Sequence, residues 1–135
     1  METNCSVLDT EAIRDMFDNV GVSIAVIDEN MNMIYINKRG NWFYKHVFGA
    51  ENLLGKNVES CHAPKNVENI KKLMQEFKDK KKSLSFFGVP LDIIEGGHLK
   101  VFHLPYFQND KFIGIIEINI ESSLEPGGRY EYKMH

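Results

Sequence analysis

The sequence of 135 residues is poor in cysteine, with only Cys5 and Cys61 and no CxxC pair. Two cysteines cannot supply the four thiolates of an all-cysteine zinc or iron–sulfur site, and we expect both to be free thiols. No apolar run approaches the ~20 residues that span a bilayer, and the first residues lack the basic and apolar regions of a signal peptide. We therefore expect a cytoplasmic protein without membrane contacts.

The sequence also lacks an excess of positive charge. It has 16 Lys and Arg against 19 Asp and Glu, which gives a net charge of −3. Domains that bind nucleic acid usually present a basic face, so we expect no nucleic-acid partner. The 43% hydrophobic and 26% charged content is ordinary for one globular domain with one core.

Three stretches have helical patterns. Asp9 or Thr10 can cap a helix that ends near Asn19, and residues 66–82 carry a clear apolar stripe with Asn66 as a plausible cap. Asn37 is a good cap for short helical turns between these two stretches. The apolar stripe of the first helix contains Ile13, Met16, Phe17 and Val20; that of residues 66–82 contains Val67, Ile70, Leu73, Met74 and Phe77.

The remaining segments resemble strands joined by tight turns. A β-hairpin is expected over 22–36, and three further strands are expected over 83–94, 98–107 and 111–121. Consecutive strands joined by tight turns are antiparallel. We therefore predict an α+β domain with a five-stranded antiparallel sheet and helices on one face. We divide the chain into an N-terminal cap helix (1–20), the domain itself (21–121) and a flexible C-terminal tail (122–135).

The order and wording of local motifs over residues 10–121 resemble PAS domains. The first hairpin matches that family's pattern at Gly21, Val22, Asp28, Ile34 and Asn37, with Met31 where a turn glycine is usual. Residues 48–57 and 104–121 resemble the family's later motifs, in which Pro105 and Gly114 fit. The closing D-I-T of the family is replaced here by Asn119, Ile120 and Glu121. The resemblance implies a sensory domain without enzymatic activity.

The segment CHAPK at 61–65 precedes the long helix. It resembles the C-H-P-P-K motif of PAS domains found beside hemerythrin-like domains, with Ala63 in place of the first proline. Cys61 and His62 are adjacent, but a catalytic dyad needs the two side chains to meet and a third group to orient the base. We therefore expect Cys61 to be an ordinary thiol and His62 to bind a backbone group at the helix boundary.

The resemblance also implies a ligand pocket. Positions two, four and six before Pro105 face inward in PAS domains, and here they are His103, Val101 and Leu99. The expected pocket lies between the sheet and the long helix, and its other lining residues are Phe77, Met74, Ile116, Ile118 and Trp42. His103 is either a satisfied buried imidazole, a polar contact for a small molecule, or a haem ligand.

No cofactor is assigned from the sequence. His62 is the second candidate polar or haem ligand after His103. However, familiar haem-binding PAS domains carry their proximal histidine on the long helix, and residues 66–82 contain none.

The same strand alternation places Phe102 and Leu104 on the outer face of the sheet. An apolar outer face needs a cover. The stripe of Ile13, Met16 and Phe17, or a second subunit, could provide it, so we expect a homodimer.

We expect the domain to bind a small molecule that favours one packing of the long helix or of the N-terminal cap helix. Contacts within the dimer or with a partner protein would then transmit this change. The alternatives are a dimerisation module without ligand and a haem-based redox or gas sensor.

Overall fold

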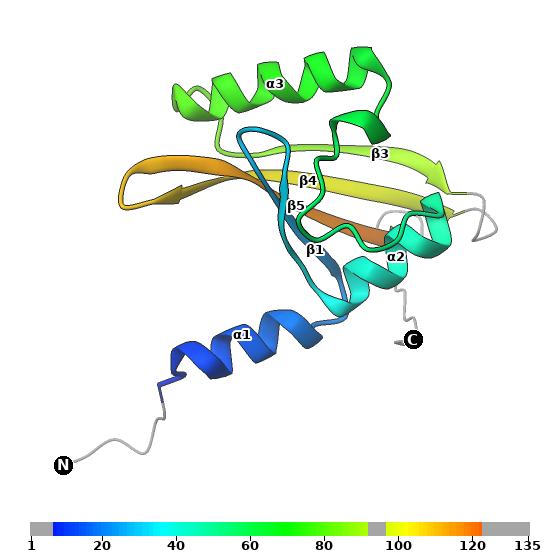
Figure 1. Cartoon of the computed structure of the whole chain (residues 1–135), viewed down its shortest axis with the longest axis vertical. Coiled ribbons are helices and arrows are strands. Elements are labelled where there is room, and N and C mark those ends of the chain that lie inside the picture. The colour runs from blue at the N-terminus through cyan, green and yellow to red at the C-terminus, as the bar shows by residue number, and fades with distance from the viewer. Residues whose placement is uncertain (1–6, 92–96, 123–135) are drawn as a thin grey trace.

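The computed structural model describes residues 7–91 and 97–122. Its core element is one antiparallel five-stranded sheet with the strand order β2-β1-β5-β4-β3 (Figure 1). The strands are β1 (Ser23–Asp28), β2 (Met33–Ile36), β3 (Ser85–Leu91), β4 (Gly97–Gln108) and β5 (Lys111–Ser122). The predicted α+β class with a five-stranded sheet is confirmed. The predicted tail lies outside the described residues from 123 onward.

Three α-helices accompany the sheet: α1 (Thr10–Asn19), α2 (Lys38–Phe48) and α3 (Pro64–Lys78). A short 3-10 helix, η1 (Glu59–Cys61), precedes α3. Helices α2 and α3 contribute to the core on one face of the sheet, which we call the inner face. Helix α1 extends away from the sheet beside the start of α2 (Figure 1).

The helix starts follow from their capping residues. Asp9 caps α1 as expected, because its Oδ1 accepts a hydrogen bond of 2.8 Å from the backbone N–H of Ala12. The expectation that Asn66 caps the long helix is wrong, since α3 already begins at Pro64. Proline suits the first helical position because its missing N–H would have no partner there, and it keeps Ala63 extended.

The buried apolar side chains form two clusters. The larger cluster lies under α3 and consists of Ala25, Met31, Met33, Leu53, Val58, Met74, Phe77, Phe112 and Ile115. The smaller cluster lies under α2 and consists of Phe43, Leu99 and Val101, with Trp42, Tyr44 and Val47 packed against it. Met74 and Phe77, which were expected beside Leu99 and Val101, thus belong to a different cluster.

The register of β4 and β5 corrects the expected pocket. His103 pairs with Glu117, whereas Phe102 pairs with Ile118 and Leu104 with Ile116. Directly paired residues share a face of the sheet, so Ile116 and Ile118 lie on the outer face. The expectation that they line the pocket with His103 is wrong.

Met31 adopts the left-handed conformation (φ 69°) at the turn where the resemblance leads one to expect glycine, and it is fully buried. The backbone strain costs about 1–2 kcal/mol, but truncating a buried methionine costs about 2–5 kcal/mol. We expect Met31→Gly to lower the free energy of unfolding by about 1–3 kcal/mol, measured by urea denaturation. A more stable variant would show that strain outweighs packing at this turn.

Candidate functional site

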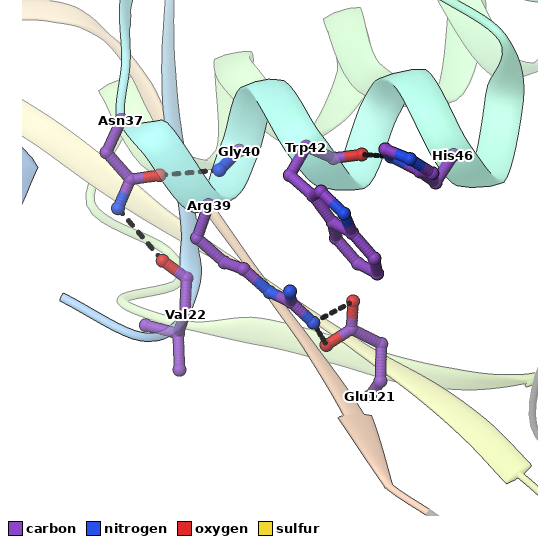
Figure 2. A network of polar contacts seen from close by, with 7 residues as sticks. All are labelled: Val22, Asn37, Arg39, Gly40, Trp42, His46 and Glu121. Carbon is purple, nitrogen blue, oxygen red and sulfur yellow. Dashed lines mark hydrogen bonds and ion pairs between the residues drawn. The ribbon is translucent and has the colours of Figure 1, made fainter. Parts of the chain in front are cut away.

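The buried side chain of Asn37 connects the start of α2 to neighbouring elements (Figure 2). It is 1% exposed, and its Oδ1 accepts from the N–H of Gly40 at 2.8 Å and of Ile24 at 3.0 Å. Its Nδ2 donates to the carbonyl oxygens of Val22 at 2.9 Å and Phe17 at 3.0 Å. The predicted N-cap is confirmed, and one amide joins the end of α1, β1 and the start of α2.

A buried ion pair connects α2 to the end of β5 (Figure 2). Nη2 of Arg39 lies 3.2 Å and 3.3 Å from the two carboxylate oxygens of Glu121, and both side chains are 4% exposed. The guanidinium carbon lies 3.8 Å from the ring centroid of Trp42, whose ring stacks on His46 at 4.6 Å. Trp42 is therefore half-buried over this ion pair.

A second polar group, which we call the inner-face network, consists of Tyr44, His103, Glu117 and Asn119. The hydroxyl of Tyr44 donates to Oε1 of Glu117, and Nδ2 of Asn119 donates to the same oxygen at 2.9 Å. Nε2 of His103 lies 2.8 Å from Oε2 of Glu117. Because an ionised carboxylate only accepts hydrogen bonds, Nε2 of His103 carries a proton.

The network keeps Glu117 ionised. Burial alone would raise the pKa of Glu117, but the hydrogen bond and charge of His103, with the hydrogen bonds of Tyr44 and Asn119, lower it to about 2. Burial and the Glu117 carboxylate raise the pKa of Tyr44 well above its usual value. Near neutral pH, Glu117 is thus an anion and Tyr44 a neutral donor.

Solvent reaches this network although it lies on the helix-covered face. Glu117 is on β5, the middle strand, yet its side chain keeps 27% exposure, while that of His103 keeps 10%. Phe87 of β3 pairs with Val101 and so also faces inward, but it is 48% exposed. The part of the Glu117 side chain that solvent reaches thus lies on the same face of the sheet as Phe87 and His103, whose rings are 5.9 Å apart.

The lowered pKa of Glu117 predicts a loss of stability in acid. The folded-state pKa of Glu117, about 2, lies below the ordinary 4.5. The contribution of the ionised carboxylate to the free energy of unfolding is therefore complete above pH 4.5 and is lost as pH falls toward 2. We expect Glu117→Gln to lose less unfolding free energy between pH 5 and pH 2 than the unchanged protein, measured by urea denaturation at each pH. Equal losses would mean that Glu117 is not stabilised as an anion.

The two histidines proposed as haem ligands each have a partner within the protein, and haem ligation by either stays a prediction. Nε2 of His103 is committed to Glu117, and His62 is exposed, with Nδ1 donating to the carbonyl oxygen of Val58 at 2.8 Å. The expected backbone bond of His62 is thus confirmed. Across residues 7–91 and 97–122, no three or more His, Cys, Asp or Glu side chains are grouped to hold a metal.

Several polar residues of the inner face were missed from the sequence: Arg39, Tyr44, Glu117, Asn119 and Glu121. The available indication was the run EINIE at 117–121, in which a polar side chain recurs at every second position. Three polar residues in the middle strand must find partners if they face the core.

A family comparison identifies the architecture. The sequence profile of the PAS domain family matches residues 13–121. The chain belongs to the PAS domain family. The more specific likeness of residues 61–65 to domains beside hemerythrin-like regions stays a prediction. No curated protein sequence matches the chain significantly.

Solved structures share this PAS fold. A C-terminal domain from Streptococcus mutans superposes with a TM-score of 0.67 at 18% identity, covering 88% of this chain and 89% of that one. The PAS domain of BvgS from Bordetella pertussis gives 0.58 at 20%, covering 86% and 87%. A sensor histidine kinase from Vibrio cholerae gives 0.58 at 11%, covering 84% and 90%. These identities support the fold alone.

Among the helices that the structure describes, none combines the length and apolar character needed to cross a membrane.

Proposed function

We propose that this PAS domain is a non-enzymatic sensory module, and that a small molecule binds on the inner face of the sheet in a recess beside Glu117, which we call the inner-face recess. The observation that carries the proposal is the partial exposure of the Glu117 side chain on the covered face of the middle strand. An apolar surround with a few convergent polar groups is typical of small-molecule sites. Here Phe87 supplies apolar surface, and Glu117 and His103 supply polar groups.

The contacts of α2 suggest how binding changes the domain. Tyr44 and Arg39 of α2 both bind carboxylates of β5, and Asn37 joins the start of α2 to the end of α1. A ligand that takes over a hydrogen bond of Glu117 would favour one packing of α2 on the sheet. The change would reach α1 through Asn37.

Extraction of the purified protein tests the proposal. We expect denaturation of the protein to release a small molecule that mass spectrometry detects. The variant His103→Leu should retain less of this molecule, because it loses the donor that orients Glu117. His98→Leu, an exposed position of the same strand, serves as the control and should retain the ligand. An absorbance spectrum of the same sample reports haem. If the protein releases nothing and binds no compound offered to it, the sensory proposal fails.

A second candidate function is dimerisation, and the exposed stripe of α1 favours it. No residue of α1 is buried, and Ile13, Met16 and Phe17 are 41%, 48% and 44% exposed. The outer face of the sheet is also apolar, since Phe102 and Leu104 are only half-buried beside Ile116 and Ile118. A second copy of the chain would cover both surfaces.

We expect Leu104→Glu to shift sedimentation from dimer to monomer, because a carboxylate buried without a partner in the interface is costly. Lys72→Glu, an exposed position on α3, is the control and should leave association unchanged. Sedimentation of the unchanged protein as a monomer at high concentration would contradict the homodimer.

A further inference from the structure

The hydrogen bonds of Glu117 leave room for one more partner. A carboxylate offers about four acceptor positions. Among the residues that the structure describes, Tyr44 and Asn119 occupy two at Oε1, and His103 occupies one at Oε2. Because 27% of the side chain is exposed, we expect a ligand in the recess to reach the remaining position.

The charges around the recess favour a donor over an acceptor. The polar groups that face Glu117 are Tyr44 from α2, His103 from β4 and Asn119 from β5 itself, and each already donates to it. The neighbouring cation on this face, Arg39, holds Glu121 with two contacts. In the part of the chain that the structure describes, His103 and Arg39 are thus already engaged by Glu117 and Glu121, so an anionic ligand would be repelled by the Glu117 carboxylate.

One side of the recess is apolar. The ring of Phe87 is about half exposed on the inner face, and Val101 and Leu99 are buried beside it on β4. A flat ligand body can cover the exposed ring and remove apolar surface from water.

We propose that the recess selects a small molecule with a cationic N–H donor on a flat apolar body, and that Glu117 is the residue that recognises the cation. This specificity rests on the proposed function, because it names the ligand class of the same site. A charge-assisted hydrogen bond is about twice as strong as a neutral one, so the cation should be preferred over a neutral isostere.

Three probes of one shape test the preference: benzamidine, benzamide and benzoate, as cation, neutral molecule and anion. Each is titrated into ¹⁵N-labelled protein at neutral pH while the amide signals of β4 and β5 are followed by NMR. We expect benzamidine to bind about tenfold more tightly than benzamide, and benzoate to bind most weakly. Benzoate binding as well as benzamidine would overturn the cation preference.

Two variants assign the preference to residues. Glu117→Gln should reduce the benzamidine advantage over benzamide to near unity, whereas the exposed control Glu68→Gln should keep it. Phe87→Ala should weaken benzamidine and benzamide alike without changing their ratio. An unchanged ratio in a folded Glu117→Gln variant would remove Glu117 from recognition.

The outcomes separate this inference from the function that it deepens. Binding of benzamide or benzoate in the recess without a preference for benzamidine would refute the cation specificity and leave the sensory function standing. If no probe shifts these amide signals and the protein releases no compound on extraction, both fail. The probe series on the unchanged protein is decisive even if a variant does not fold.

Discussion

Gly114→Ala should prevent stable folding. A Cβ atom at Gly114 of β5 would lie 1.9 Å from the carbonyl oxygen of Ile27 and 2.8 Å from the Cα of Asp28. Both are backbone atoms of the paired strand β1, so no side-chain rotation relieves the contact. We expect the free energy of unfolding, measured by urea denaturation followed by circular dichroism, to fall by more than about 4 kcal/mol. Domains of this size hold only about 5–15 kcal/mol in total.

Gly88→Ala in β3 is the matched control. A Cβ atom there would meet only the carbonyl oxygen of Leu99, at the ordinary contact distance of 3.8 Å. Its effect should stay within about 0.5 kcal/mol. Similar stability of the two variants would contradict the close approach of β1 and β5. Gly114 is one of the positions at which the sequence fits the PAS pattern, and the close approach of β1 gives the steric reason for glycine there.

Local patterns were enough to predict the elements of the fold. The cap of α1 at Asp9, the cap of α2 at Asn37 and the five strands each depend on residues within a few positions of one another. The inward position of His103 came from the family's spacing to Pro105 and agrees with the structure, which leaves that residue 8% exposed. These local determinants were therefore predicted correctly, whereas the start of α3 at Pro64 was missed in favour of a cap at Asn66.

The orientation of β5 could not be predicted in this way. The alternation of Ile116 and Ile118 with Glu117 and Asn119 shows which residues share a face, but it does not say which face the helices cover. Apolarity favoured the isoleucines for the inner face. The structure places the polar residues there, because Tyr44 of α2, far away in sequence, supplies a partner for the Glu117 carboxylate. Such long-range pairing has no local pattern.

The buried pair of Arg39 and Glu121 is the other long-range contact of β5, and it lies 82 positions apart in sequence. Removing two charges from water is costly, and their attraction compensates only while both are present. The pair therefore fixes α2 against the end of β5 more than it adds net stability. Loss of one partner alone should lower the free energy of unfolding, because the other charge stays buried without a counter-ion.

Arg39→Met should lower the free energy of unfolding by about 3–5 kcal/mol, because it leaves the 4%-exposed carboxylate of Glu121 without its ion-pair partner. The double variant Arg39→Met, Glu121→Leu removes both charges and should recover most of this loss in the same urea denaturation experiment. Lys71→Met breaks the exposed pair with Glu59, which has a similar separation of 3.1 Å, and should cost at most about 1 kcal/mol. If the double variant is no more stable than Arg39→Met alone, then the loss arises from the packing of the arginine on Trp42 and not from the stranded charge.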